Sequence, residues 1–573
     1  MSRADRRTAL TALAAAAAVA AVALLPLVVD DYWTYLATSA LILGLVAASI
    51  GVVTGRAGML SLCQLSFAAV GAYGVAWCQA HAPGLPFVVK ALAGTLLAVP
   101  VGVLVGLPAL RLRGVNLAIV TLTFAVAVAA VLADQGFPGA NSGTIVERPG
   151  FAETDPAYFR FVWVAFVIVA LLLAWAGRRR LGAAWLAVRQ SERATAALGL
   201  SVVRIKLGAF AVAAAVAGLA GALSAGQTGV LTAATFSPLA SLSVFALAIF
   251  IGAQYPVGAV AAGALVAFFP EILRRLGLPQ DLGDVLFALG AIQALSMGAS
   301  VVGRARSALA ARAASREAPA PAAPPPAPAR APDRRRPSGA PVLEVDGLTV
   351  RFGAVVALDG ASLTVPEATV CGLIGPNGAG KSTMIDAVSG FTPYAGSVRL
   401  DGRAVDALPA HRRARAGLRR TFQHDRTIAA LRVGEYARLA APAGTAERDI
   451  AEALAFLGCP APEVPLERVD VGARRLVELA AALCGRPRVV LVDEPAAGLA
   501  EAESRDLAER LAAIPERFGA AALVVDHDME LVQRACAHVT VLDFGRVIGE
   551  GSPAEVLSTP DVVAAYLGEA VPA

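Results

Sequence analysis

Apolar residues follow two different patterns along this chain. From Thr8 to about Val302 they form long, nearly unbroken runs, whereas from Val342 onward short apolar runs alternate with charged residues. The first pattern predicts membrane-spanning helices, and the second predicts a soluble domain of strands and helices. A span needs about 20 apolar residues, because a helix rises about 1.5 Å per residue across about 30 Å of hydrocarbon. About ten spans are predicted, at 8–29, 34–53, 62–80, 87–109, 115–133, 160–176, 207–225, 238–253, 256–272 and 283–302.

Basic residues between these runs indicate which side of the membrane each end faces. Arginines at 3, 6, 7, 56, 111, 113, 178–180 and 304 mark the cytoplasmic side, and Asp30, Asp31 and the polar loop 134–158 lie opposite. Arg274 and Arg275 fall on the wrong side in this count. A basic start before an apolar stretch is also typical of a signal peptide, but the stretch is long and lacks a persuasive cleavage site, which favours a first span.

Residues 303–340 separate the two patterns. This stretch is rich in Ala, Pro and Arg and has no periodicity, so it cannot bury a core and its prolines favour an extended, semi-stiff spacer. We therefore expect a membrane domain at 1–302, a linker at 303–340 and a soluble domain at 341–573.

Composition narrows the possibilities further. The mean hydropathy is +0.64 and the net charge is only +5, with the arginines at the ends of apolar runs and in the linker, which argues against a nucleic-acid-binding protein. The six cysteines show no metal-binding spacing, and four lie in the soluble half. We place the soluble half in a reducing cytosol and expect all six cysteines to be buried small hydrophobic residues.

The soluble half contains the chemistry of phosphate binding. VCGLIGPNGAGKSTMIDAVSG (370–390) reads as a strand, a GxxxxGKS loop and a helix. Such a loop surrounds phosphates with backbone N–H groups at a helix N-terminus, while Lys381 reaches the β and γ phosphates and Ser382 ligates magnesium. The predicted nucleotide-binding residues of this loop are Gly375, Pro376, Asn377, Gly378, Ala379, Gly380, Lys381, Ser382 and Thr383.

Two further strands end in candidate catalytic residues. VVLVDEP (489–495) ends in two carboxylates, of which Asp493 is predicted to hold magnesium and Glu494 to polarise the attacking water. AALVVDHDMEL (521–531) ends at His527, which could donate to a γ-phosphate oxygen, although a lone histidine at a strand end is more often structural.

Together these residues resemble an ABC transporter ATPase over 342–570, which implies an α/β P-loop fold with ATP and Mg²⁺ as cofactors. The resemblance makes Gln423 in RRTFQHDR the glutamine that links magnesium and water to the permease contact. It also makes Phe352 in VRFGAVVALDG the aromatic residue that stacks on adenine. The closing run GSPAEVLSTPDVVAAYLGEA (551–570) and FQHDR are similar to the ATPase subunit of branched-chain (hydrophobic) amino acid importers.

The membrane half resembles the permease of the same importer family over nearly all of 33–300. GRAGMLSLCQLSFAAVGAYGVAW (55–77) mixes polar and small residues into an apolar run, and Gly208, Gly218 and Gly221 predict a close helix crossing. AAWLAVRQSERATAALGLSVVRIKLGAF (183–210) interrupts the spans with a charged, amphipathic stretch that predicts a short surface helix ending near Gly199. It resembles the cytoplasmic coupling loop of importer permeases, with Glu192, Ala196 and Gly199 in the matching positions.

One motif departs from the ATPase pattern. The family carries an LSGGQ-like signature before the helix that corresponds to GARRLVELAAAL (472–483), and here Val469, Asp470, Val471, Gly472 and Ala473 occupy that place. In the family the signature serine binds the γ-phosphate held by the opposite subunit, so here a carboxylate would face that phosphate. Ala500 also replaces the usual Asn or Asp after the magnesium strand. Sequence drift in a poorly functional copy of such an ATPase would produce the same kind of altered signature.

These features favour a fused permease and ATPase of an importer of branched-chain or other hydrophobic amino acids in the bacterial inner membrane. We expect a polytopic α-helical membrane domain followed by an ABC ATPase, a partner permease and ATPase, and an extracytoplasmic binding protein. The chain is predicted to be an ATP hydrolase, but the altered signature leaves open whether it turns over ATP alone. A urea or short-amide importer, an exporter and a membrane-tethered ATP sensor remain alternatives.

Overall fold

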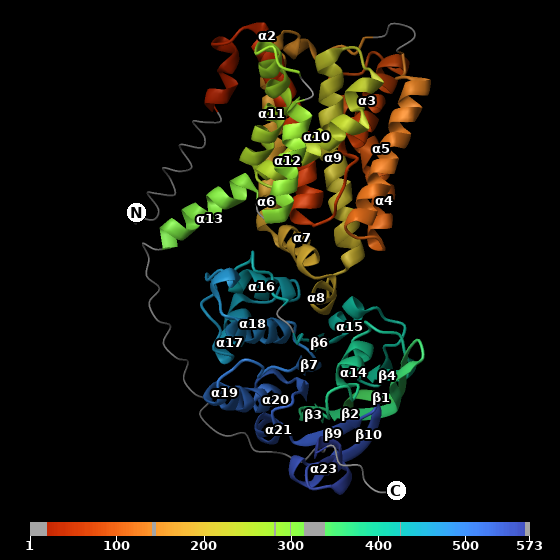
Figure 1. The fold of residues 1–573 in the computed structure, drawn as a ribbon, viewed down its shortest axis with the longest axis vertical. Coiled ribbons are helices and arrows are strands. Elements are labelled where there is room, and N and C mark those ends of the chain that lie inside the picture. The colour runs from red at the N-terminus through yellow and green to blue at the C-terminus, as the bar shows by residue number, and fades with distance from the viewer. Residues whose placement is uncertain are drawn as a thin grey trace. The chain divides into compact units, whose positions relative to one another are not determined.

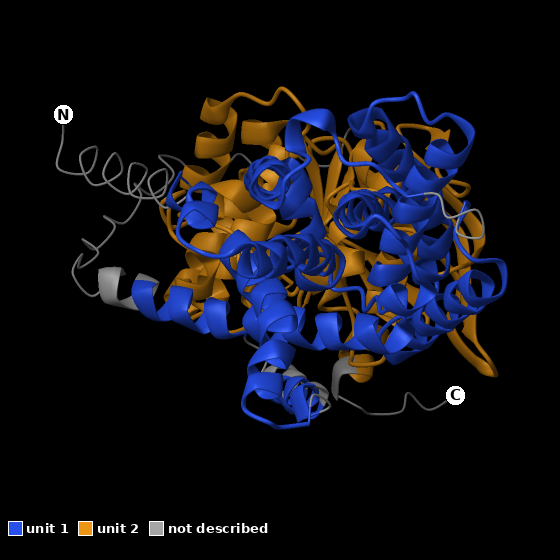
Figure 2. Ribbon diagram, turned by 90° about the horizontal axis from the view of Figure 1, so that it is seen from above, with its two compact units in different colours: residues 1–185, 203–319 blue, residues 186–202, 320–573 orange. Residues whose placement is uncertain are grey.

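The computed structural model describes residues 20–139, 145–279, 282–297, 300–314, 339–423 and 426–567. It divides the chain into two compact units, shown in different colours in Figure 2. Unit 1 comprises residues 1–185 and 203–319, and unit 2 comprises residues 186–202 and 320–573. A short piece of the permease-like sequence therefore belongs to the same unit as the soluble domain.

Unit 1 is a bundle of helices (Figure 1). Its elements are α2 (Asp31–Ile50), which continues as a π-helical turn to Arg56, α3 (Gln64–His81), α4 (Phe87–Gly106), α5 (Val115–Gln135), α6 (Asp155–Arg178), α9 (Val202–Thr228), α10 (Pro238–Ile251), α11 (Pro256–Arg275), α12 (Leu282–Met297) and α13 (Val301–Ala314). Helix α7 (Arg180–Gln190) continues from unit 1 into unit 2. The apolar helix α2 packs against α6, α10 and α11, and α3 packs against α4.

Six helices in the described part of the chain are long and apolar enough to cross a membrane, so the predicted count of about ten is not confirmed. They are 31–56, α4, α5, α6, α9 and α11. The range 238–253 corresponds to a shorter apolar helix, and 283–302 divides into α12 and α13. Helix α3 carries Gln64, Gln79 and His81, which lower its hydropathy. The predicted span 8–29 lies largely outside the described residues.

The glycine-rich crossings predicted from the sequence are present at two of three positions. A Cβ atom added to Gly221 would lie 1.7 Å from the carbonyl oxygen of Ala68, and one on Gly218 would lie 2.6 Å from the Cβ of Ala98. Helix α9 therefore approaches α3 and α4 more closely than any side chain allows. Gly208 has no atom within 4 Å of such a Cβ and does not contribute to a crossing.

The polar stretch before α3 is a break in the helical backbone, at residues 58–63. The amide of Leu62 donates to Thr121 Oγ1 at 3.1 Å, and Ser241 Oγ donates to the carbonyl of Leu62 at 2.7 Å. Irregular backbone is tolerated at membrane depth where other parts of the protein satisfy it. Here the side chains of α5 and α10 do so, which explains why serine and threonine interrupt apolar helices.

Glu271 pairs with Arg274 and Arg275, the two arginines that the charge count placed on the wrong side of the membrane. Its carboxylate accepts hydrogen bonds from Arg274 Nε at 2.8 Å and from Arg275 Nε at 2.7 Å. The guanidinium of Arg275 also lies 4.6 Å from the ring centre of Trp33 at the start of α2. The end of α11 therefore lies beside the Asp30–Asp31 end of α2, and its positive charge is partly neutralised in place.

The first residues of the predicted linker, 303–314, belong to helix α13 and are not extended, whereas the linker bounds themselves stay a prediction. This piece contains alanine, arginine, serine and leucine but no proline, so nothing prevents a helix there. The proline-rich part, at 315–338, lies outside the described residues.

Unit 2 contains two sheets and the predicted α/β domain. An antiparallel sheet has the order β2 (Val355–Pro366), β1 (Pro341–Phe352), β4 (Ala395–Leu400), β5 (Arg403–Ala404). A second sheet has the order β10 (Arg546–Gly551), β9 (His538–Asp543), β3 (Val370–Ile374), β8 (Ala521–Val525), β7 (Val489–Asp493), β6 (Leu418–Arg420), and all its pairings except β9–β10 are parallel. The carboxyl ends of β3, β7 and β8 therefore lie at one edge.

Ten helices complete the described part of unit 2 along with the short helix α8 (Glu192–Ala197). They are α14 (Lys381–Val388), α15 (Ala410–Ala416), α16 (Val433–Ala440), α17 (Glu447–Phe456), α18 (Val471–Cys484), α19 (Glu501–Ala512), α20 (Ile514–Phe518), α21 (Met529–Ala535), α22 (Pro553–Val556) and α23 (Pro560–Leu567). Buried residues of α14, such as Met384 and Ile385, share one core with strands of both sheets. This packing fixes the helix that follows the phosphate loop. The cysteines form no disulfide, and all but the half-buried Cys459 are buried, as expected.

Candidate functional site: the nucleotide site of unit 2

The GxxxxGKS loop connects β3 to α14, as its sequence predicts. Gly378 and Gly380 have φ angles of +87° and +104°, which strain any other residue. A Cβ on Gly380 would lie 2.6 Å from the carbonyl oxygen of Ala357, whereas nothing lies within 4 Å of a Cβ on Gly378. The loop is thus packed at its helical end and open at its middle, where backbone N–H groups can approach a phosphate.

Lys381, the first residue of α14, lies folded over this loop. Its Nζ donates to the carbonyl oxygens of Gly375 at 2.7 Å and Pro376 at 2.9 Å. Burial lowers the pKa of Lys381, and the nearby carboxylates of Glu494 and Asp493 oppose that shift. Both acidic residues predicted from VVLVDEP therefore lie close enough to the lysine to act on it electrostatically.

Asp493 ends β7 with a buried carboxylate. Its backbone N–H donates to Thr421 Oγ1 at 3.2 Å, and Arg420 Nη2 donates to Oδ2 at 3.3 Å. Burial raises the pKa of Asp493, and Arg420 acts in the opposite direction. The other oxygen, Oδ1, is buried and has no hydrogen-bond partner among the described residues. A buried carboxylate oxygen without a donor fits a hard cation such as Mg²⁺.

Glu494 and Gln423, both predicted catalytic residues, are in contact. Gln423 Nε2 donates to Glu494 Oε2 at 2.9 Å. Glu494 has a φ of +46°, and its N–H donates to the carbonyl of Val525 on β8 at 2.7 Å. A left-handed conformation is unusual for a residue with a side chain and is concentrated at functional sites. It is held here by the hydrogen bond to the neighbouring strand.

His527 follows β8 and presents a side chain that is 68% exposed. The residue before it, Asp526, is buried and accepts hydrogen bonds from the N–H groups of His527 at 2.7 Å, Asp528 at 3.0 Å and Ala496 at 3.2 Å. Asp526 therefore ties the histidine loop to the loop after Glu494. Our sequence analysis missed this residue, although an acidic residue at the end of an apolar strand was a visible signal.

Arg475 and Glu478 on α18 are two more residues that the sequence analysis missed. Arg475 Nη2 donates to the carbonyl of Gln423 at 3.0 Å, and its Nη1 donates to the carbonyl of Glu494 at 3.3 Å. Glu478 Oε1 accepts from the N–H of Phe422 at 3.2 Å. Helix α18 thus holds the backbone of both catalytic loops, and its arginine in RRLVEL was the available signal.

The altered signature lies at the exposed start of α18. Asp470 is the N-cap residue of this helix, and its Oδ1 accepts from the N–H of Ala473 at 2.8 Å. Aspartate and serine are comparable N-caps, so the replacement keeps the helix start while it adds a charge. Val471 is exposed, and a Cβ on Gly472 would lie 2.9 Å from the side chain of Leu499 in the loop after Glu494.

The predicted coupling segment packs against the soluble domain within unit 2. Arg415 Nε donates to the carbonyl of Gly199 at 2.7 Å, and Arg426 Nη1 donates to Ser191 Oγ at 3.2 Å. Ala194 and Ala197 of α8 form a small buried cluster with Phe422. Gly199 lies directly at this contact, Ala196 lies within α8, and Glu192 is its first residue, so the predicted surface helix does end near Gly199.

Phe352, predicted to stack on adenine, is at the end of β1 and is 55% exposed. An exposed ring of this kind is available to a planar base. Its contact with a base stays a prediction. The residues predicted to bind phosphate and cation, in contrast, converge at the carboxyl edge of β3 and β7.

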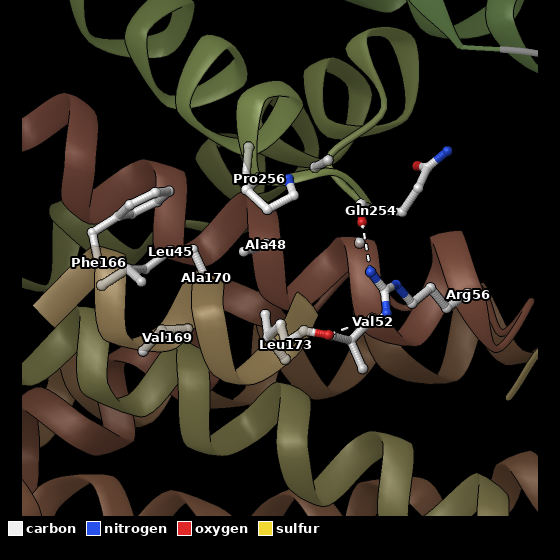
Figure 3. Close-up of a pocket in the computed structure, with 13 residues that line it drawn as sticks. Leu45, Ala48, Val52, Arg56, Phe166, Val169, Ala170, Leu173, Gln254 and Pro256 are labelled. Atoms are coloured by element: carbon white, nitrogen blue, oxygen red, sulfur yellow. Dashed lines mark hydrogen bonds between the residues drawn. The ribbon is translucent and has the colours of Figure 1, made fainter. Parts of the chain in front are cut away.

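Unit 1 contains a small cavity between α2, α6 and the start of α11 (Figure 3). Its volume is about 20 Å³, which suits about one water molecule rather than an amino acid. Arg56 lies at one end and donates to the carbonyls of Leu173 at 3.3 Å and Gln254 at 3.2 Å. The cavity is therefore too small to hold a cargo molecule in this conformation.

Models of known protein families match both halves of the chain. Residues 32–295 match the model of the branched-chain amino acid transport system permease component, 358–497 match the ABC transporter model, and 546–572 match the branched-chain amino acid ATP-binding cassette transporter model. A solved nucleotide-free ATP-binding cassette from an ABC transporter is 25% identical, with a TM-score of 0.36, covering 40% of this chain and 99% of that one.

Two named relatives match the soluble half over nearly their whole length. The high-affinity branched-chain amino acid transport ATP-binding protein BraF of Pseudomonas aeruginosa is 37% identical over 252 residues, or 40% of this chain and 99% of BraF. LivG of Salmonella typhimurium is 33% identical over the same shares. The chain belongs to the branched-chain amino acid ABC transporter family, as a membrane permease fused to its ATPase.

Proposed function

We propose that the chain is one permease–ATPase half of an ATP-driven importer that moves branched-chain or other hydrophobic amino acids across the bacterial inner membrane. A second permease and ATPase would complete the transporter, and an extracytoplasmic binding protein would deliver the cargo. The names of BraF and LivG and the permease model support this cargo class. Urea and short amides remain the alternative cargo.

The ATPase site has the groups that phosphoryl transfer needs. Lys381 and the loop N–H groups would hold the phosphates of ATP, and Ser382, Asp493 and Gln423 would hold Mg²⁺, which neutralises phosphate charge when it is bound. Glu494, held at its carboxylate by Gln423, would orient and polarise the attacking water. His527 is exposed at the same edge and would donate to the γ-phosphate.

The observation that carries the proposal is the docking of segment 191–199 beside the catalytic glutamine. Ala194 and Ala197 pack on Phe422, the next residue is Gln423, and Gln423 is hydrogen-bonded to Glu494. One packing contact, one peptide bond and one hydrogen bond therefore join a piece of permease sequence to the residue that would act on water. A shift of this segment would displace Gln423 through Phe422, and closure of the ATPase around ATP would in turn move the segment.

The altered signature supports a partner of different sequence. The phosphate loop and the Asp493–Glu494 pair retain the groups needed for one site, whereas Asp470 would bring a negative charge to the phosphates held by a partner. In a dimer of two identical chains both sites would carry this fault. In a pair with a chain whose signature is intact, the phosphate loop of this chain would work normally.

Transport in membrane vesicles tests the proposal. The chain is co-expressed with the second permease and ATPase, and ATP-dependent accumulation of labelled leucine is measured with the binding protein present, using Lys381→Ala as the control without ATP chemistry. Leucine uptake lost in the control supports the proposal. Uptake of urea instead of leucine overturns the cargo, ATP-driven efflux overturns the direction, and ATP binding without turnover in the complete assembly supports a sensor instead.

A further inference from the structure

Four charged side chains of unit 2 form a row from the docked segment to the predicted magnesium carboxylate. Arg193 of α8 lies 3.1 Å from Asp386 of α14. Asp386 also pairs with Arg420, and Arg420 Nη2 lies 3.3 Å from Asp493 Oδ2. The charges alternate in sign along the row, so each inner residue is shared between two partners.

The row passes from the surface into the core. The side chain of Arg193 is 50% exposed and that of Asp386 is 21% exposed, whereas Arg420 and Asp493 are 5% and 3% exposed. Interactions between the inner members are screened little by water, and those at Arg193 are screened more. The outermost member is therefore the one that can leave or join the row at low cost.

Aromatic rings hold the guanidinium groups in place. The Arg193 guanidinium lies 5.7 Å from the ring centre of Phe391, and that of Arg420 lies 5.8 Å from Phe391 and 4.7 Å from Phe422. Cations at these distances from aromatic faces are attracted to them. Phe391 thus contacts an arginine at each end of the Asp386 bridge, and Phe422 adjoins the alanines of α8.

We propose that Arg193 is a positioning residue that adjusts cation binding at Asp493 through Asp386 and Arg420. With Arg193 docked, it shares the charge of Asp386, so Arg420 is held more by Asp493 and competes there with Mg²⁺. With Arg193 withdrawn, Asp386 holds Arg420 alone, and Asp493 is freed for the cation. This inference rests on the proposed function, because it takes 191–199 as the moving segment and Asp493 as the magnesium ligand.

The row would act beside the Phe422–Gln423 contact and differs from it in kind. That contact transmits position by packing and reaches Glu494 through the hydrogen bond of Gln423, whereas the row transmits charge to the carboxylate of Asp493. The row also predicts the sign of the change in cation affinity. Departure of segment 191–199 strengthens cation binding at Asp493, and its return weakens it. Movement of the permease would therefore change the Mg²⁺ affinity of the nucleotide site.

The test is a Mg²⁺ titration of nucleotide binding to the purified full-length chain, followed with a fluorescent ATP analogue. Arg193→Ala is expected to lower the Mg²⁺ concentration at half-saturation about two- to fivefold, the range of a partly exposed ion pair. Asp386→Asn is expected to raise it, because Arg420 then rests on Asp493. Arg193→Lys keeps the charge and should restore the wild-type value.

The double variant Arg193→Ala/Asp386→Asn separates the row from a general effect of charge. If the row acts through Asp386, loss of Arg193 changes nothing further in the Asp386→Asn background. Equal effects in both backgrounds overturn the inference. Arg517→Ala is the matched control, because Arg517 pairs with Glu452 at 2.7 Å on the surface and its loss removes the same charge.

The two proposals fail in different ways. If the wild-type chain binds the analogue with a clear Mg²⁺ requirement that Arg193→Ala leaves unchanged, the row is overturned and the importer is not. If the wild-type chain shows no Mg²⁺-dependent binding, the nucleotide site itself is wrong. Melting temperatures of all variants, measured without nucleotide, identify any variant that has lost its fold, and Arg193→Lys then provides the comparison.

Discussion

One glycine and one buried polar side chain of the nucleotide site differ in their surroundings from a glycine and a buried polar side chain of the helical bundle. In the phosphate loop, a Cβ on Gly378 would meet nothing within 4 Å, whereas in the bundle one on Gly221 would lie 1.7 Å from a backbone oxygen. Among the described residues, no group donates a hydrogen bond to the buried Oδ1 of Asp493, whereas Gln64 at the helix break is hydrogen-bonded to both Ser49 and Ser61. The nucleotide site therefore has open space and a buried acceptor for a ligand, whereas the helix crossing at Gly221 and the helix break at Gln64 are closely packed or hydrogen-bonded within the bundle.

This contrast predicts that substitutions in the two units change different quantities. In the nucleotide site they should change turnover or cation binding and leave the melting temperature nearly constant. In the bundle they should change the melting temperature before they change ATP chemistry. The predictions that follow test each side of the contrast.

The largest effect is expected at Glu494. In the assembled transporter, Glu494→Gln should lower ATP hydrolysis by about 100- to 10,000-fold, the contribution of a well-placed general base. It should keep ATP binding and the melting temperature, because Gln preserves the backbone and the contact with Gln423. Phosphate release measures the turnover. Glu501→Gln, which alters an exposed carboxylate paired with Arg505, is the control. Near-normal turnover in Glu494→Gln would exclude Glu494 as the group that activates water.

The second prediction concerns the bundle. Gly221→Ala should destabilise unit 1 by about 1–3 kcal/mol, the usual cost of inserting an atom into a packed site, and should lower the melting temperature in detergent. Gly208→Ala lies on the same helix, has space for the added methyl group, and should be neutral or slightly stabilising. Equal melting temperatures for the two variants would contradict the close crossing of α9 and α3.

The third prediction concerns Asp470, where the two kinds of effect can be separated. Two unit charges 4 Å apart repel by about 1 kcal/mol even in water, so Asp470→Ser should raise the turnover of the chain purified alone at least about fivefold. Asp470→Asn keeps the helix cap without the charge and should also raise turnover. Asp470→Ala should instead lower the melting temperature, because it removes the cap.

Each outcome at Asp470 has a definite meaning. An increase in turnover for Asp470→Ser but not for Asp470→Asn would show that the hydroxyl group matters and the charge does not. No increase in either variant would show that the signature is aligned wrongly or that its charge is unimportant. Restoration of turnover by a partner ATPase, without any change at Asp470, would support the asymmetric pair directly.

The sequence predicted the parts of the fold whose chemistry requires fixed residue types. A phosphate loop needs glycine, lysine and serine at set spacing, so the β3–loop–α14 unit could be identified from residues 370–390. Gln423 came from the family resemblance and Glu494 from the two carboxylates that end the strand VVLVDEP, and the structure places the two side chains 2.9 Å apart. The fold class, a helical membrane domain followed by an ABC ATPase, is confirmed by the family models.

The remaining features depend on distances between segments that are remote in the sequence. Asp386 and Arg420 are 34 residues apart and become partners only when α14 lies beside β6. Glu271 partly neutralises Arg274 and Arg275, which a count of charges by loops places on the wrong side of the membrane. The break at 58–63 is visible as polar residues, but its hydrogen bonds to Thr121 and Ser241 come from other helices. Hydropathy alone could therefore not give the number of spans.

The smallest expected effect is the pH dependence of cation binding. Burial raises the pKa of Asp493 from the ordinary value of an aspartate, and Arg420 opposes that shift. A proton and Mg²⁺ compete for the same carboxylate, so the Mg²⁺ concentration needed for half-saturation should increase as the pH falls through that raised pKa. Removing the opposing charge with Arg420→Gln should raise the pKa further and move this transition to higher pH. Titration of ATP itself is the same in both proteins and cancels in the comparison. If the transition stays at the same pH or moves to lower pH in Arg420→Gln, Asp493 is not the titrating ligand. The contrast between an open nucleotide site and a closed bundle could then no longer be based on Asp493.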